Sequence, residues 1–164
     1  QSDFFTLFGL PQIFTQDLTV IKSRFYQLQQ KVHPDKFVNA PLAEKRAAVV
    51  LAATINDAYQ VLCSPLKRAL YLLKLYGVDV QSETDTAMPM DFLMEQMELR
   101  ERLAQKEGQS LKEEIETKLS ACMQEMSLLL DKESTSTDLK QARLVARQMQ
   151  FFVRLIQEYE ENQS

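Results

Sequence analysis

The sequence contains few of the residues that build metal sites, disulfides or tight turns. Its 164 residues include three glycines, no tryptophan and a single histidine, His33. The two cysteines, Cys63 and Cys122, lie far apart without a CxxC motif. Tetrahedral zinc needs four ligands, which one His and two Cys do not supply. We therefore predict no metal site, and two buried cysteines in a reducing compartment.

Long apolar runs are also missing. No run approaches the ~20 apolar residues that cross a bilayer, and we find no secretory or transit segment at the start. We therefore expect a cytoplasmic protein without a membrane partner. The scarcity of Gly, the abundance of Leu, Ala, Gln, Glu, Lys and Met, and the lack of strand-like alternation predict an all-α fold. The chain is long enough for one domain or two small ones.

Charge divides the chain into two parts. Residues 1–76 hold nine Lys/Arg and five Asp/Glu, a balance of +4, and residues 77–164 hold ten and eighteen, a balance of −8. Two halves of opposite sign indicate two surfaces with different partners. Nucleic-acid binding is disfavoured, because the basic surplus is small and the acidic half would repel phosphate.

An amphipathic helix is predicted over residues 17–32, and a second helix after Pro41. The first has apolar residues in steps of three and four, which place them on one face. They are Leu18, Ile21, Phe25, Leu28 and Val32. Pro34 lacks an N–H and biases His33 out of the α region, so this helix should end there. We therefore expect His33-Pro34-Asp35-Lys36 in a loop between two antiparallel helices.

Basic side chains flank the apolar stripe of the first helix. Arg24 and Lys31 fall together on one flank and Lys22 on the other. A solvated face is the usual explanation of such charges. Here the basic surface leads directly into the loop that contains His33 and Lys36, which favours an acidic protein partner.

The loop has two simpler explanations. His33 and Asp35 could do no more than end a helix and form a local turn. A His beside an Asp could also be an acid–base pair of an enzyme. However, neighbours separated by a proline rarely face each other, and the sequence has no Gly-rich phosphate loop. We predict no catalytic residue.

The second half is predicted to be an antiparallel three-helix bundle after a linker at 77–88. The first helix covers about 89–106, the second starts at a Ser110 cap, and the third begins at Thr137-Asp138. On the first helix, Phe92, Leu99 and Leu103 share a face that suits the core.

Other apolar residues of the bundle point away from that core. Leu93, Met94 and Met97 project roughly 100–200° from Phe92, and Phe151 points about 155° from the stripe of its own helix. Glu98 and Glu101 lie beside this group. An exposed apolar patch rimmed by carboxylates is typical of a protein-binding surface. The alternative is that these residues pack against the first half of the chain or against a neighbouring molecule in a crystal.

Residues 3–71 resemble a J-domain, the module that activates DnaK-type ATPase chaperones. The matching motifs occur in the right order and spacing. They are Asp3-Phe4-Phe5 with Leu7, Gly9 and Leu10; His33-Pro34-Asp35-Lys36; Ile55-Asn56-Asp57-Ala58-Tyr59-Gln60-Val61-Leu62; and Ser64-Pro65 with Lys67-Arg68-Ala69 and Tyr71. The resemblance implies a helical hairpin with the His-Pro-Asp loop at its tip. The implied chaperone-binding residues are His33, Pro34, Asp35, Lys36, Lys22, Arg24 and Lys31.

Nearly the whole chain resembles the HscB family, in which a J-domain precedes a short acidic helical bundle. Residues 92–101, with the sequence FLMEQMELRE, resemble the family's scaffold-binding segment, and Phe151 matches its companion on the last helix. The resemblance implies a co-chaperone without cofactors or catalysis. It would engage the chaperone HscA and bring it the iron–sulfur scaffold IscU. The implied scaffold-binding residues are Leu93, Met94, Met97, Glu98, Glu101 and Phe151.

The resemblance predicts a J-domain at 1–76, a linker at 77–88 and a scaffold-binding domain at 89–164. Gln105 stands where bacterial members can carry an acidic residue, which would weaken one edge of the binding surface. The cysteine pairs that precede the J-domain in animal relatives are missing from these residues, so we expect a bacterial-type member. An alternative keeps the J-domain but has it bring a different client to a general DnaK-type chaperone.

Overall fold

The protein is all-helical, as the sequence predicts. The computed structural model describes residues 3–81 and 88–163 and contains no strand among them. Its elements are α1 (Phe4–Leu7), α2 (Leu18–Lys31), the 3₁₀ helix η1 (Pro34–Phe37), α3 (Leu42–Cys63), α4 (Pro65–Leu75), α5 (Met90–Ala104), α6 (Gln109–Leu130) and α7 (Ser136–Gln163). The chain divides into two compact units, residues 1–71 and 72–164, so α4 begins in the first and ends in the second. The predicted linker at 77–88 stays a prediction, because residues 82–87 lie outside the described residues.

Within the described residues, no single helix has the length and apolar content to cross a membrane. Taken together, α3 and α4 have the length and the apolar composition of a membrane span, but the chain bends by 109° between them.

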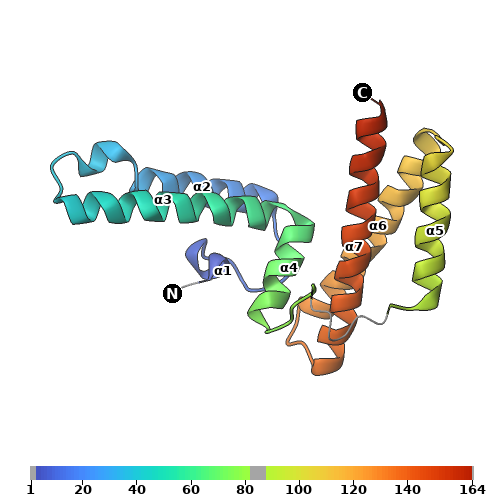
Figure 1. Ribbon diagram of the computed structural model, residues 1–164. Helices are drawn as coiled ribbons and strands as arrows, with labels where there is room; N and C mark the ends of the chain where they lie inside the picture. Colours follow the sequence, from blue (N-terminus) through green and yellow to red (C-terminus); the bar gives the residue numbers. More distant parts are fainter. Residues whose placement is uncertain (1–2, 82–87, 164) are drawn as a thin grey trace. The chain divides into compact units, whose positions relative to one another are not determined.

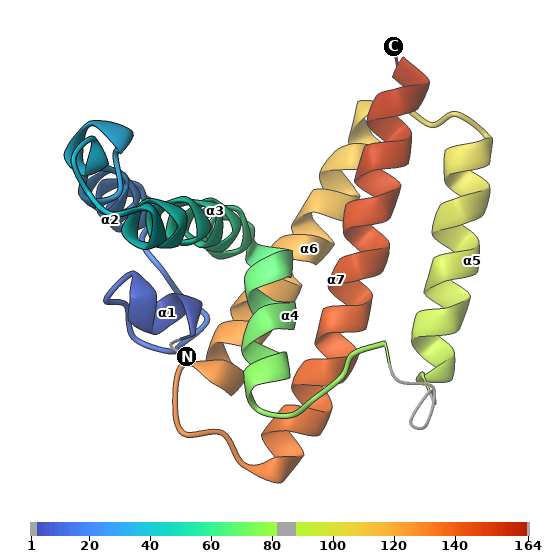
Figure 2. The same ribbon diagram turned by 60° about the vertical axis from the view of Figure 1, so that its left-hand side comes forward.

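The first unit is organised around a hairpin of α2 and α3, which lie side by side in Figures 1 and 2. α2 begins where the Asp17 side chain accepts the N–H of Thr19, which satisfies one of the free donors of its first turn. Ile21 of α2 is fully buried, together with three residues of α3, namely Ile55, Ala58 and Leu62. Because these side chains recur at helical spacing, the two helices share one apolar seam.

The segment before α2 folds back onto this hairpin. Its rings Phe5, Phe8 and Phe14 are buried. Gly9 has a positive φ of 64°, and a Cβ there would lie 2.6 Å from the Arg24 Nη1 atom. This position therefore requires glycine for two reasons: the backbone is left-handed, and the Arg24 side chain approaches too closely for a Cβ atom.

The second unit contains α5, α6 and α7, which run up, down and up in Figure 2. α7 is its central element, with nine buried residues from Ala142 to Tyr159. Thr135 and Asp138 cap α7 reciprocally, because each side chain accepts the backbone N–H of the other residue.

Ion pairs connect α5 to α6. Arg102 donates to Glu107 in the intervening turn and to Glu114 of α6, at 3.0 and 2.8 Å. Lys118 of α6 lies 2.6 Å from Glu95 of α5. Hydrogen bonding to Arg102 lowers the pKa of Glu114. These pairs stabilise the position of α5, which carries one of the two candidate surfaces.

Candidate functional site

The loop at the end of the α2–α3 hairpin is a turn bonded within itself. α2 ends at Lys31, and the buried Val32 closes it. His33 is extended, with φ −59° and ψ 135°, as expected before a proline. Pro34 then opens η1, because its ring fixes φ and it needs no N–H partner. The His33 carbonyl accepts the N–H of Lys36 at 3.0 Å, which closes the turn.

His33 also caps this turn with its side chain. Its Nδ1 atom accepts the N–H of Asp35 at 3.2 Å and lies 3.6 Å from the Asp35 Oδ2 atom. A ring nitrogen that accepts a hydrogen bond carries no proton, so the neutral ring has its proton on Nε2. The Asp35 side chain is 88% exposed. The turn therefore presents an imidazole and a carboxylate to solvent, in positions set by the backbone.

The four predicted cations near this turn differ in what they contact. Lys22, Lys31 and Lys36 are exposed. Arg24 is half-buried, and its Nη1 atom donates to the carbonyls of Phe8 and Gly9 at 2.7 and 3.0 Å. Arg24 therefore holds the N-terminal segment on α2, whereas the three lysines are available to a partner.

An apolar groove of about 570 Å³ lies beside the turn, and the sequence analysis did not predict it. Val38 and Val49 on its walls are exposed, and Lys45 adds a cation to the lining. Its remaining lining residues are Val32, Pro34, Phe37, Ala48 and Ala52. The surface around His33 and Asp35 is thus both basic and apolar.

A second exposed surface runs along α5. Leu93, Met94 and Met97 are exposed, Met97 to 74%, and Met90 extends the row. The four residues have the spacing i, i+3, i+4 and i+7, so they lie on one face of the helix. We call them the α5 stripe. Met90 was not among the predicted residues, although this spacing could have revealed it. Glu98 and Glu101 are exposed beside the stripe, as predicted.

Few described residues could support other chemistry. They contain no group of three or more His, Cys, Asp or Glu that could hold a metal ion. Cys63 and Cys122 are both free. Cys122 is buried as predicted, and Cys63 is half-exposed. Burial raises the pKa of the Cys122 thiol to about 11, so its reactive thiolate is disfavoured at neutral pH.

Comparisons with known proteins agree with this division of the chain. A DnaJ domain matches residues 3–71, and the HSCB C-terminal oligomerisation domain matches residues 88–160. A co-chaperone protein HscB homolog of Chromobacterium violaceum is 50% identical over 101 residues, which cover 62% of this chain and 58% of that protein. The chain thus spans less than two thirds of that curated relative.

Solved structures cover more of the chain. The chaperone HscB from Vibrio cholerae is 32% identical, covers 99% of this chain and 98% of its own, and has a TM-score of 0.81. The chain belongs to the HscB family. The human co-chaperone protein HscB has a TM-score of 0.85 and 31% identity, with 99% of this chain and 83% of that chain covered. The predicted HscB resemblance is therefore confirmed, and so is the order of a J-domain followed by an HscB-type helical domain.

One expectation about this HscB family member is wrong. Phe151 was expected on the exposed surface, but only 6% of it is accessible. α5 covers it, since the Phe92 ring meets the Phe151 ring edge-on with centroids 5.8 Å apart. The Arg100 guanidinium also lies 5.4 Å from the centre of the Phe151 ring. Phe151 points away from the α6-facing stripe of α7 because it faces α5 instead.

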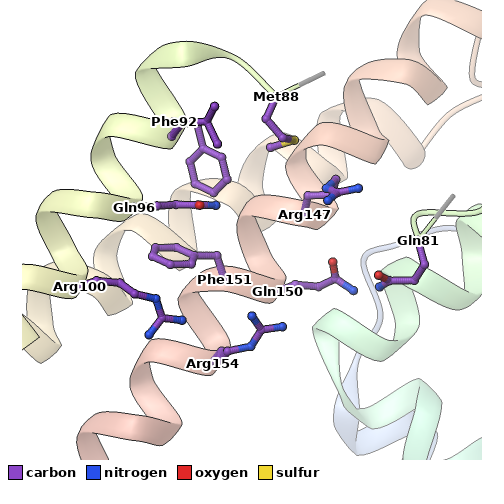
Figure 3. A pocket seen from close by; sticks show the side chains of 10 residues that line it. Gln81, Met88, Phe92, Gln96, Arg100, Arg147, Gln150, Phe151 and Arg154 are labelled. Carbon is purple, nitrogen blue, oxygen red and sulfur yellow. The ribbon is translucent and has the colours of Figure 1, made fainter. Parts of the chain in front are cut away.

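Beside Phe151 the HscB-type domain has a pocket of about 330 Å³ between α5 and α7 (Figure 3). Leu93 belongs both to this pocket and to the α5 stripe. Its other lining residues are Gln81, Met88, Phe92, Gln96, Arg100, Arg147, Gln150, Phe151 and Arg154. The roles assigned to the predicted binding residues on both surfaces stay predictions.

Proposed function

We propose that the protein stimulates the ATPase of a DnaK-type chaperone of the HscA kind and delivers an IscU-type iron–sulfur scaffold to it. The observation that supports this most directly is the presence of two exposed surfaces in different units of the chain. One combines the turn at 33–36 with lysines, and the other is the apolar α5 stripe with two carboxylates. Such an arrangement suits a protein that holds two partners at once.

The turn is the proposed contact with the ATPase. Lys22, Lys31 and Lys36 steer it onto an acidic patch of the chaperone. One conformation of the chaperone is competent to hydrolyse ATP. His33 and Asp35, with Pro34 between them, bind this conformation more tightly than they bind the others. Activation requires this difference in affinity, because equal binding to both states shifts no equilibrium. In this proposal the protein contributes binding energy, and the ATPase performs the chemistry.

The α5 stripe is the proposed contact with the scaffold. Its methionines adapt to an irregular apolar surface, and Glu98 and Glu101 give it a charged rim. Phe151 supports this surface from below, since it packs against α5. Delivery is then a tethering effect, because a client bound to one unit has a high local concentration near the chaperone on the other.

The test is steady-state ATP hydrolysis by a purified HscA-type chaperone, with this protein and an IscU-type scaffold added singly and together. We expect more stimulation from the two additions together than either gives alone. His33→Gln should reduce the stimulation at least about tenfold, equivalent to about 1.4 kcal/mol, and leave scaffold binding unchanged. Met97→Ala with Leu93→Ala should weaken scaffold binding and leave stimulation by this protein alone unchanged.

Three other results would count against the proposal. In the first, ATP hydrolysis rises on addition of this protein but rises no further when the scaffold is added as well. That result would keep the role of the J-domain and indicate a different client, delivered to a general DnaK-type chaperone. The absence of any stimulation would mean that the turn only ends a helix. If His33→Gln impaired both activities in a folded protein, the two surfaces would not be independent.

A further inference from the structure

The pocket between α5 and α7 is strongly basic, although it lies in the acidic half of the chain. Residues 77–164 carry a net charge of −8, yet the described residues that line the pocket include three arginines and no Asp or Glu. In Figure 3, Arg100 enters from α5 and Arg147 and Arg154 from α7, with Phe151 among them. An all-positive lining in a negatively charged unit is not explained by overall composition.

Two of these arginines have no carboxylate partner among residues 3–81 and 88–163. Arg100 is paired, because its Nη1 atom lies 2.7 Å from the Glu158 Oε2 atom. Arg147 donates to the backbone carbonyl of Val80 at 3.3 Å, which orients its guanidinium without neutralising it. Arg154 is exposed and forms no ion pair with any residue in the described part of the chain. The pocket therefore holds two positive charges that no carboxylate of the described residues compensates.

The chemistry of the lining suits an anion with two acceptor oxygens, such as a carboxylate. A guanidinium binds a carboxylate through two parallel N–H donors, which gives both energy and orientation. Gln96 and Gln150 add amide donors to the lining. The ring of Phe151 carries Arg100 over its face, which keeps that guanidinium from moving freely. A carboxylate entering the pocket would meet donors on more than one side.

The position of the pocket indicates where such a carboxylate comes from. Leu93 lines the pocket and also belongs to the α5 stripe, so the two features are continuous. A protein that covers the stripe would place its neighbouring side chains at the pocket mouth. We propose that the pocket receives the carboxylate of an Asp or Glu side chain on the scaffold protein that docks on the α5 stripe. This inference rests on the proposed function and adds an electrostatic contact to it.

Arg154 is the residue that tests this best, because it is exposed and contributes no ion pair to the described fold. Arg154→Glu would set two carboxylates against each other, so we expect the scaffold to bind at least about tenfold more weakly. Arg154→Lys keeps the positive charge but loses the paired N–H donors of the guanidinium, so its loss of scaffold affinity should be smaller. Lys140→Glu is the matched control, since it makes the same charge change on α7 about 21 Å along the helix and does not line the pocket.

The experiment is isothermal titration calorimetry of the full chain with a purified IscU-type scaffold, at low and at physiological salt. Arg154→Glu should weaken binding far more than Lys140→Glu, and higher salt should reduce that difference. An Asp→Lys or Glu→Lys substitution on the scaffold should restore binding to the Arg154→Glu chain. A merely structural role of Arg154 would not produce this charge-swap recovery.

Each contrary result overturns a different statement. The pocket contact would be refuted if the Arg154→Glu and Lys140→Glu chains bound the scaffold with equal affinity. The proposed function would still stand if the double variant Met97→Ala with Leu93→Ala lost scaffold binding. An unaltered chain that binds no scaffold would refute both. Free glutamate and inorganic phosphate are each titrated into the full chain in separate experiments. The NMR signals of the arginine side chains report whether either anion binds. If either occupies the pocket while Arg154→Glu leaves scaffold affinity unchanged, the pocket is a small-anion site and the proposal is wrong.

Discussion

Phe151→Ala should destabilise the second unit even though sequence patterning places Phe151 on the surface. The ring is 6% exposed and meets Phe92 and Phe152 with centroids 5.8 and 5.7 Å away. Removing a buried phenylalanine side chain costs about 3–5 kcal/mol when the surroundings do not collapse. Because the ring borders an open pocket, solvent can fill part of the space, so we expect about 3 kcal/mol, at the lower end of that range.

Three contributions make up this value. Burial of an aromatic side chain is worth roughly 1.5–3 kcal/mol. Edge-to-face contacts add about 0.5–1.5 kcal/mol, and the Arg100 guanidinium over the ring adds about 0.5–1 kcal/mol at a partly exposed site. Met97→Ala is the matched comparison, because Met97 is 74% exposed. Its free energy of unfolding should change by no more than about 0.5 kcal/mol.

Urea unfolding of the intact chain, followed by far-UV circular dichroism, measures the difference. With a urea slope of about 1–3 kcal/mol/M, Phe151→Ala should lower the midpoint of the second unit by about 1–3 M. The transitions of the two units are fitted separately where they do not coincide. If Phe151→Ala and Met97→Ala had the same midpoint, the burial of Phe151 under α5 would be refuted. Phe151 would then belong to the exposed surface.

Two further predictions concern ionisable groups of the second unit. Hydrogen bonding to Arg102 lowers the pKa of Glu114 below its ordinary value of 4.5, so the pair stabilises the fold above pH 4.5 and loses this effect as the pH falls through the lowered pKa. Glu114→Gln should therefore reduce stability at pH 7 by less than about 1 kcal/mol, and its stability should converge with that of the unaltered chain in acid. Glu116→Gln is the matched control, because Glu116 is exposed on the same helix and forms no ion pair with the described residues. A stability difference that is equal at both pH values would contradict this prediction. Burial raises the pKa of the Cys122 thiol to about 11. A thiol reagent at pH 8 should therefore label the half-exposed Cys63 first, which mass spectrometry can follow. Faster labelling of Cys122 would contradict its burial.

Local features of the fold were predictable because they depend on neighbouring residues. A proline biases the residue before it out of the α region, and α2 ends at Lys31, ahead of Pro34. Phe92, Leu99 and Leu103 share a helix face, and all three are buried as predicted. The predicted Ser110 cap is wrong by a small margin, since α6 begins at Gln109 after Gly108. Helix ends are less certain than helix faces because several residues can satisfy the first turn.

Contacts between distant residues were not predictable in this way. Leu18 has the spacing of the buried stripe of α2 but is 55% exposed, because periodicity does not say where the partner helix ends. Arg24 was predicted to belong to a basic binding surface, and its hydrogen bonds to the carbonyls of Phe8 and Gly9 were not foreseen. Phe151 was misplaced for a similar reason. α7 packs against helices on two faces, and a single-stripe model assigns its second buried face to solvent.

The self-bonded turn at 33–36 affects the entropy of binding. Ordering one residue of a flexible loop costs about 1–2 kcal/mol. A partner that had to order four residues would lose roughly 4–8 kcal/mol of binding free energy. Here the Pro34 ring, the closing bond to the His33 carbonyl and the cap on Asp35 fix the backbone before any partner arrives. A partner can therefore use most of its contact energy for affinity, so loosening this turn would weaken binding even with every contacting side chain still present.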